Sequence, residues 1–95
     1  MSAYLVFTRE KTLDQKELDT YSKLAGPTLA GHPGKVLAFY GRHEDLEGPA
    51  TESLVILEFP NLQAAKDWYN SPSYREAREH RFKGAKYHVN LVEGV

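Results

Sequence analysis

The chain has no cysteine, one methionine and one tryptophan among its 95 residues. Without cysteine it has neither a disulfide framework nor thiolate chemistry, and this fits a reducing compartment. No apolar run approaches the roughly 20 residues that a membrane-spanning helix needs. The first residues, Met1–Tyr4, lack the basic and apolar regions of a secretory signal. We therefore expect a soluble, cytoplasmic protein with no membrane partner.

An excess of charge of either sign is also lacking, because 12 basic and 13 acidic residues leave a formal net charge of -1. This balance gives no long-range attraction to nucleic acid. The chain has no glycine-rich phosphate loop, no serine-centred nucleophile motif and no basic patch with interleaved aromatic residues. Nucleotide-dependent, hydrolase and nucleic-acid functions are therefore without support, and a small molecule or a protein is the expected partner.

What the sequence does contain is two apolar runs with little polar alternation, Ala3–Thr8 and Leu54–Phe59. Such runs are typical of central strands that are covered on both faces. A further strand is predicted at Lys35–Tyr40, followed by an exposed loop from Gly41 to Ala50. The last strand, Lys86–Val92, alternates as an edge strand does.

Two helical regions separate these strands, and each begins at a capping residue, Asp14 or Asn61. Gly26-Pro27 is expected to kink or restart the first helix. Ser71-Pro72 interrupts the second, and a serine cap followed by proline predicts a new helical segment over residues 73–82.

The order strand, helix, strand, strand, helix, strand predicts an α+β ferredoxin-like βαββαβ sandwich in one domain of residues 1–95. Its antiparallel four-stranded sheet has the order 4-1-3-2, with two helices on one face. This order puts the two apolar runs in the centre of the sheet. The helices cover one face only, although both faces of these runs are apolar. We therefore expect a homodimer in which two sheets meet about a two-fold axis.

Short motifs along nearly the whole chain together resemble one protein family. They are Ala3-Tyr4, Pro27-Thr28-Leu29, Gly34, Leu46-Glu47-Gly48, Val55-Ile56-Leu57-Glu58-Phe59-Pro60, Ala64-Ala65, Trp68-Tyr69, Ser71-Pro72-Ser73-Tyr74, Arg81 and Leu91-Val92-Glu93-Gly94. The family is domain of unknown function family 1330, and the resemblance implies a dimeric α/β barrel. Related barrels include cofactor-free monooxygenases acting on aromatic or quinone substrates, haem-degrading enzymes and small isomerases, but a fold does not fix a function.

The chain departs from the family pattern in its second strand. Where the family has an arginine and two glycines, this sequence has Phe39-Tyr40-Gly41. An anion-binding role of that arginine therefore does not carry over to Phe39.

Glu58 is the one charged residue in its strand and a candidate general base in a cleft between the sheet and the helices. The alternative is a carboxylate at the strand end that is paired with Arg81. Tyr69 and Tyr74 lie on either side of the Ser71-Pro72 break, where their hydroxyls would bind a polar group of a substrate. Tyrosines at helical spacing are more often core residues with a solvated tip, which is the alternative for both.

Arg78 and Arg81 are three residues apart and would together bind a carboxylate, although a solvated helix face explains Arg78. Trp68 is expected in the core or in a pocket wall. Four histidines lack the spacing of metal ligands, so we expect no metal and no cofactor; they are His32, His43, His80 and His88.

Two functions remain open at this stage. The first is a pocket for an unidentified small molecule, with cofactor-free proton transfer or oxygenation of a small aromatic or acidic compound and with Glu58 as base. Its predicted wall consists of Tyr40, Glu58, Trp68, Tyr69, Tyr74 and Arg81. The alternative is a non-catalytic binding or assembly module, in which the same pocket binds a metabolite or is filled by its aromatic side chains. A cavity smaller than about 300 Å³ favours this alternative.

Overall fold

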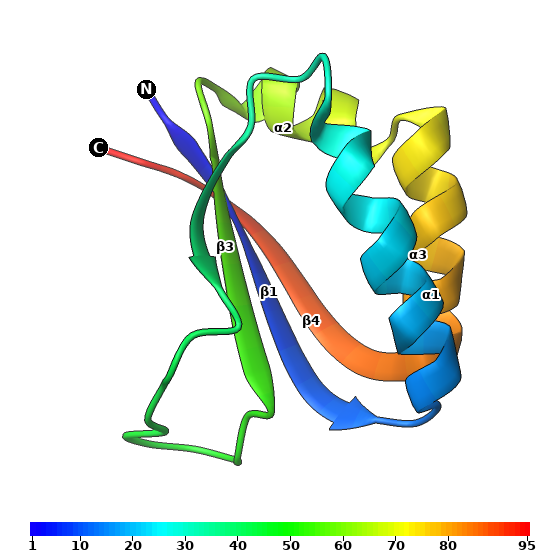
Figure 1. Cartoon of the computed structure of the whole chain (residues 1–95). Helices are drawn as coiled ribbons and strands as arrows, with labels where there is room; N and C mark the ends of the chain where they lie inside the picture. The colour runs from blue at the N-terminus through cyan, green and yellow to red at the C-terminus, as the bar shows by residue number, and fades with distance from the viewer.

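The computed structural model describes residues 1–95, with four strands, three α-helices and one short 3-10 helix. In chain order these are β1 (Ala3–Thr12), α1 (Gln15–Ala25), the 3-10 helix (Gly26–Leu29), β2 (Lys35–Phe39), β3 (Ser53–Phe59), α2 (Leu62–Tyr69), α3 (Pro72–Gly84) and β4 (Ala85–Glu93). The strands form one antiparallel sheet in the order β2-β3-β1-β4, which confirms the predicted order. All the helices lie on one side of this curved sheet (Figure 1).

The central strands alternate between the two faces of the sheet. Ala3, Leu5 and Phe7 of β1 are at most 3% exposed, and they pair with Phe59, Leu57 and Val55 of β3. These side chains face the helices and form the core together with Trp68 and other residues of the helices. Burial of this face provides most of the free energy that holds the helices against the sheet.

Each α-helix begins at the capping residue that the sequence indicates. The side chain of Asp14 accepts a hydrogen bond from the backbone nitrogen of Lys16 at 3.0 Å. Asn61 caps α2 and Ser71 caps α3 in the same way. The predicted break at Gly26-Pro27 is the 3-10 helix. Because these caps satisfy amides that have no partner within the helix, they fix where each helix starts.

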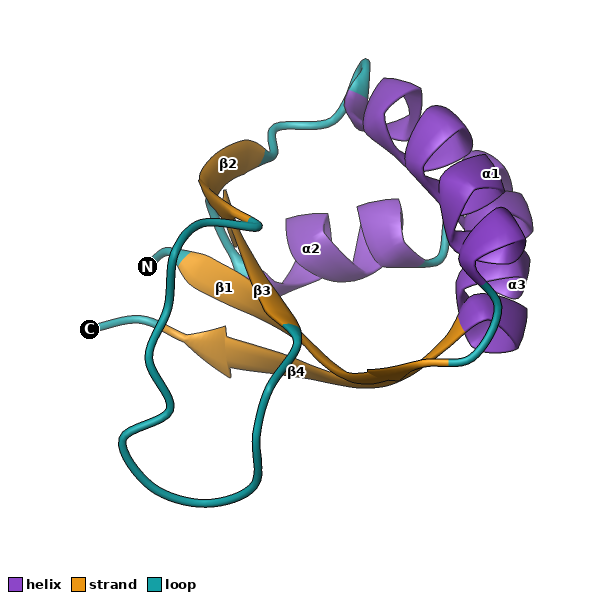
Figure 2. Cartoon of the chain, turned by 60° about the horizontal axis from the view of Figure 1, so that its bottom comes forward, coloured by secondary structure: helices purple, strands orange, loops and turns teal.

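α1 and α3 pack against each other at the start of α1 (Figure 2). The carbonyl oxygen of Gly84 accepts a hydrogen bond from the backbone nitrogen of Asp14 at 2.9 Å. A Cβ atom at Gly84 would lie only 2.9 Å from the side chain of Leu18. Glu17 Oε2 lies 2.6 Å from His80 Nδ1 and joins the two helices a second time. The two helices therefore form one rigid layer opposite the sheet.

The ends of β1 and β2 differ from the prediction. β1 runs to Thr12 rather than ending at Thr8, so Arg9 lies within the strand on the same face as Phe7. β2 ends at Phe39, and Tyr40 has a left-handed φ of 53°. Its backbone nitrogen still donates to the carbonyl oxygen of Leu54 at 3.0 Å. This turn directs the chain away from the sheet edge.

No element of the chain covers the second face of the sheet. The half-buried side chains of Tyr4 and Val6 in β1 and of Leu54 and Ile56 in β3 lie there. The central part of this face is therefore apolar, as the two apolar runs predict. None of the helices is long and apolar enough to span a membrane.

Candidate functional site

A cavity of about 120 Å³ lies between the sheet and the helices. Every strand contributes to its wall, together with α1, the 3-10 helix and α2. Eleven of its 13 wall residues are hydrophobic and none carries a charge. On the β2 side the wall is open, because the Phe39 side chain there is 65% exposed.

The volume limits what the cavity holds. It is smaller than the roughly 300 Å³ of an ordinary ligand pocket. An apolar cavity of about 150 Å³ in another protein accommodates benzene. At about 120 Å³ the cavity suits at most one aromatic ring, and its volume favours the non-catalytic alternative by the 300 Å³ criterion.

Trp68 belongs both to the core and to the cavity wall. It is 2% exposed, and its ring centroid lies 4.1 Å from that of Tyr74 and 5.7 Å from that of Phe59. Its indole Nε1 donates to Thr28 Oγ1 at 3.0 Å. Because the hydroxyl of Thr28 in turn donates to the carbonyl oxygen of Ala25, the indole is held in one orientation. Both expectations for Trp68, core and pocket wall, are met by the same side chain.

Tyr21 of α1 and Tyr74 of α3 share a buried hydrogen bond. Their hydroxyl oxygens are 2.7 Å apart, and Tyr74 is completely buried. Burial raises the pKa of Tyr21, and the neighbouring Tyr74 raises it further. Burial also raises the pKa of Tyr74. Both phenols are therefore neutral at physiological pH and act as hydrogen-bond donors and acceptors, and Tyr21 presents this pair to the cavity.

Arg81 is a buried cation without a carboxylate partner. Its side chain is on α3, it is 2% exposed, and it takes part in no ion pair. One terminal nitrogen donates to Tyr69 Oη at 3.3 Å, whereas Nε has no partner. Three aromatic rings surround the guanidinium at 5.0 to 5.7 Å: Phe7, Phe82 and Tyr87. Two of them, Phe7 and Tyr87, also form the cavity wall.

The charge of Arg81 persists despite its burial. Burial by itself lowers the pKa of this guanidinium, but the neighbouring oxygens of Tyr74, Tyr21 and Tyr69 outweigh that effect and raise it. The sequence-predicted residues Tyr69, Tyr74 and Arg81 therefore do lie together. Their cluster lies behind the wall of the cavity, and Tyr21 connects the two.

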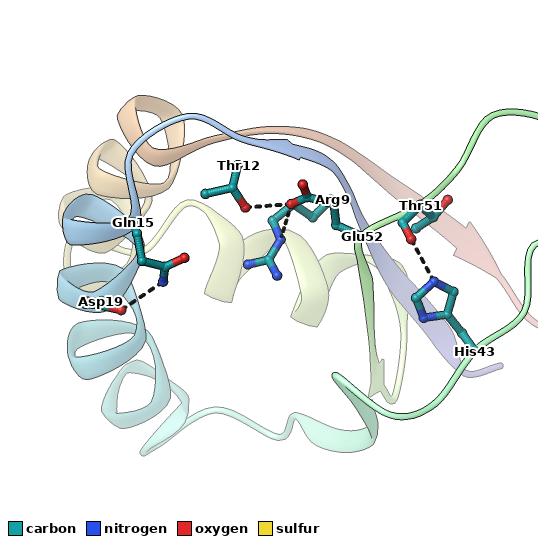
Figure 3. Close-up of polar contacts among 7 residues, drawn as sticks. All are labelled: Arg9, Thr12, Gln15, Asp19, His43, Thr51 and Glu52. Carbon is teal, nitrogen blue, oxygen red and sulfur yellow. Dashed lines mark hydrogen bonds and ion pairs between the residues drawn. The ribbon is translucent and has the colours of Figure 1, made fainter.

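Tyr40 stands at the open side of the cavity. Burial raises the pKa of its hydroxyl, and the adjacent Tyr87 contributes to the increase. The guanidinium carbon of Arg9 lies 5.8 Å from the centre of the Tyr40 ring. Arg9 Nε in turn lies 3.2 Å from Glu52 Oε1, which also accepts a hydrogen bond from Thr12 at 2.6 Å (Figure 3).

Glu58 does not belong to this site, and its predicted role needs correction. It alternates with Val55, Leu57 and Phe59, so its side chain lies on the face of the sheet away from the helices. Its neighbours across the sheet are Tyr4 and Lys35. Glu58 is therefore neither a base in the cavity nor a partner of Arg81. Because both parities of the strand are apolar, the sequence did not reveal on which face the single charge lies.

Arg78 and the histidines lie outside the cavity. Arg78 donates to the backbone oxygen of Tyr69 at 2.9 Å and stacks on its ring, so it does not share an anion with Arg81. His43 Nε2 lies 2.8 Å from the backbone oxygen of Thr51 (Figure 3). No three side chains of the metal-binding types gather into a cluster.

Sequence reasoning missed three residues of the site, namely Arg9, Tyr21 and Tyr87. Arg9 lies one residue beyond the predicted strand Ala3–Thr8 and begins a charged segment, so it was not considered for the site. The signal that identifies it is parity, since it stands two residues after Phe7 and shares its face. Tyr21 lies three residues after Leu18 and four before Ala25, and this helical spacing indicates an inward-facing side chain without indicating its partner Tyr74.

An antiparallel sheet of this order, with its helices on one face and a cavity between the two layers, defines a ferredoxin-like α+β protein. The chain belongs to the family described as Domain of unknown function (DUF1330), whose model matches residues 2–95. A search of curated proteins found no match.

Solved structures share the fold at low sequence identity. The RPA0582 protein of unknown function from Rhodopseudomonas palustris is 20% identical, with a TM-score of 0.74 over 99% of this chain and 82% of that one. SnoaB, a cofactor-independent oxygenase from Streptomyces nogalater, is 10% identical, with a TM-score of 0.67 over 99% and 93% of the two chains. A dimeric protein of unknown function from Bacteroides fragilis, described as having a ferredoxin-like fold, is 14% identical, with a TM-score of 0.63 over 98% and 96%.

Proposed function

We propose that this protein is a homodimer, and that each subunit binds a small single-ring aromatic compound with an acidic oxygen in the cavity. The observation that carries this proposal is Arg81, a buried guanidinium whose polar partners are tyrosine hydroxyls and which has no carboxylate partner. A buried charge without a counter-charge is costly, and an anionic ligand oxygen close to it would offset that cost.

The composition of the cavity wall supports the same ligand. An apolar wall that contains Trp68 favours an aromatic ring over a sugar or a nucleotide. The hydroxyls of Tyr21 and Tyr74 lie between the cavity and Arg81. The guanidinium polarises these hydroxyls, which strengthens the hydrogen bond that they would donate to the ligand oxygen. Tyr69 holds the guanidinium, and Tyr40 covers the ring from the open side.

Cofactor-free oxygenation of the bound compound is the second candidate function. With Glu58 on the other face, the wall offers no carboxylate or imidazole to act as a base, so proton transfer from a weakly acidic substrate has no support. A phenol that binds near Arg81 in its ionised form needs no such base. The electron-rich phenolate is also the form that reacts with oxygen. The cofactor-independent oxygenase SnoaB has the same fold, which makes this reaction class worth testing.

The test of the binding proposal compares 4-hydroxybenzamide with benzamide by calorimetric titration at pH 8.5, because the two compounds differ only in the phenolic oxygen. We expect the phenol to bind at least about tenfold more tightly, since a charged hydrogen bond contributes about 1.5–3 kcal/mol. Arg81→Lys keeps the charge but loses the planar fork, and we expect it to remove most of this preference. Arg75→Lys, an exposed arginine of the same helix, is the matched control.

The outcome that contradicts the proposal is the absence of binding by both amides, or an unchanged preference in Arg81→Lys. Oxygen uptake by the complex with 4-hydroxybenzamide, together with incorporation of labelled oxygen into the product, separates oxygenation from binding alone. If the compound binds and no oxygen is consumed, the non-catalytic function is the one that remains.

A further inference from the structure

The Arg9 guanidinium lies at the open side of the cavity and takes no part in binding the phenolic oxygen. It extends from β1 on the face that bears Phe7, toward the helices rather than away from them (Figure 3). Two wall residues lie beside it: Tyr40, whose ring centre is 5.8 Å from the guanidinium carbon, and Tyr87, which pairs with Arg9 across β1 and β4. Arg9 therefore lies at the rim of the cavity.

This guanidinium is anchored on one edge only. Nε is buried and forms an ion pair with Glu52 Oε1 at 3.2 Å, but it donates no hydrogen bond. The hydroxyl of Thr12 donates to the same Glu52 oxygen at 2.6 Å. The Thr12 hydrogen bond is the largest cause of the lowered pKa of Glu52, so this carboxylate stays ionised. The two terminal nitrogens of Arg9 take part in no hydrogen bond or ion pair, and they point away from Glu52 into the space between sheet and helices (Figure 3).

A guanidinium that is ion-paired on its Nε edge still has its two terminal nitrogens as a fork, and this fork matches the two oxygens of a carboxylate. A surface arginine loses side-chain entropy when it binds an anion. The ion pair with Glu52 already restricts the Arg9 side chain in part, so binding a ligand carboxylate costs less of this entropy.

The two cations lie at different depths. Arg81 packs over the rings of Phe7 and Tyr87 and is buried, whereas Arg9 follows Phe7 by two residues in β1, pairs with Tyr87 across β4 and is partly exposed. A ring in the cavity that is directed toward both cations would carry an oxygen group at its inner end and another at the rim.

We infer that Arg9 binds a ligand carboxylate at the rim of the cavity and selects a para-hydroxylated aromatic acid over its uncharged analogue. This inference rests on the proposed function, because the ring must occupy the cavity with its phenolic oxygen toward Tyr21 and Arg81. Glu52 and Thr12 are the positioning residues that hold the fork of Arg9 toward the ligand.

The experiment uses 4-hydroxybenzoate and 4-hydroxybenzamide, which share the ring and the phenol and differ in the group at the rim. Dissociation constants are measured by NMR titration of the full chain at pH 7.5. We expect the unchanged protein to bind the carboxylate about tenfold or more tightly than the amide, which corresponds to about 1.4 kcal/mol. Arg9→Gln is expected to abolish this preference while leaving the amide affinity within about twofold.

Lys11→Gln is the matched control, because it removes one positive charge from the same strand at an exposed position. We expect Lys11→Gln to keep the preference. Arg9→Lys retains the charge without the fork and is expected to keep only part of the preference for the carboxylate. An equal loss in Arg9→Gln and Lys11→Gln means that general electrostatics cause the preference, and this overturns the inference.

The remaining outcomes separate the two proposals. If both compounds bind and Arg9→Gln leaves the preference unchanged, the role of Arg9 is refuted while binding in the cavity stands. If neither compound binds to the unchanged protein, the proposed function fails and the inference fails with it.

Discussion

Tyr21 and Tyr74 show what a polar group needs in order to lie in an aromatic core. Each hydroxyl is buried, and each finds the other at 2.7 Å. An unpaired buried hydroxyl is destabilising, so replacing one member of such a pair costs more than the bond itself contributes. The pair therefore stabilises the fold and, through Arg81, takes part in the proposed site.

The free energy of unfolding at alkaline pH should depend on this tyrosine pair. The pKa of both tyrosines is raised from the ordinary value of 10, so the folded state keeps protons that the unfolded state loses. Their stabilising contribution is complete below pH 10 and decreases as the pH rises above it. We expect each tyrosine to lower the free energy of unfolding by about 1.4 kcal/mol per pH unit in this range.

Urea unfolding at pH 7, 9.5, 10.5 and 11 measures this dependence. The variant Tyr21→Phe has one such group fewer, so its stability should decrease less steeply above pH 10, whatever its value at pH 7. Tyr74→Phe should behave similarly. An equally steep decrease in the variant and in the unchanged protein would show that these phenols ionise alike in both states.

At the scale of single residues, the sequence identified side chains whose position follows from a helical period. Trp68, Tyr74 and Arg81 were predicted as site residues, and they are buried on the inner side of their helices. Glu58 was placed on the wrong side of its strand, because a strand that is apolar on both faces does not show which face meets the helices. Only the pairing of the strands decides this.

At the scale of elements, the contact between α1 and α3 depends on the absence of a side chain at Gly84. A Cβ atom there would approach Leu18 to 2.9 Å and its backbone nitrogen to 3.0 Å. Since backbone does not yield as a flexible side chain does, we expect Gly84→Ala to lower the free energy of unfolding by about 1–3 kcal/mol.

The control for this prediction is Gly26→Ala. Nothing lies within 4 Å of a Cβ atom at Gly26, and its φ of -54° suits any residue. Alanine there should leave the stability unchanged or raise it by about 0.4–1 kcal/mol, because it restricts the unfolded chain. Chemical denaturation of Gly84→Ala and Gly26→Ala measures both changes in stability. Equal stabilities would mean that α1 moves aside at little cost.

The capping residues predict where the helices start. The charged residues after Thr8 gave a predicted end of β1 that is too early. Glu10 of this strand lies 3.1 Å from His88 and 3.6 Å from Lys86 of β4. The charged segment therefore stays paired with β4, with the side chains of Lys86 and His88 beside Glu10. A single sequence does not show such a pairing, because the partners are far apart in the chain.

At the scale of the whole molecule, the open face of the sheet decides how the chain behaves in solution. Its centre is the apolar group of Val6, Leu54 and Ile56, with Tyr4 beside it. Charged and polar side chains of β4 lie at one edge of this face, among them Lys86 and His88. An apolar centre with a polar rim is the usual anatomy of a protein interface.

Ile56 lies in the middle of this face, opposite Val6 of β1 and Ala38 of β2. If two sheets meet here about a two-fold axis, Ile56 lies close to its own copy, and Ile56→Lys places two like charges in an apolar interface. We expect light scattering at micromolar concentration to give twice the subunit mass of 10.8 kDa for the unchanged protein and the single mass for Ile56→Lys.

Leu46→Lys, in a loop position that is 85% exposed, adds the same charge elsewhere and should remain a dimer. The thermal midpoint of the dimer should rise with concentration, whereas that of the monomeric variant should not. A single subunit mass for the unchanged protein would refute the dimer and would leave the apolar face to another partner.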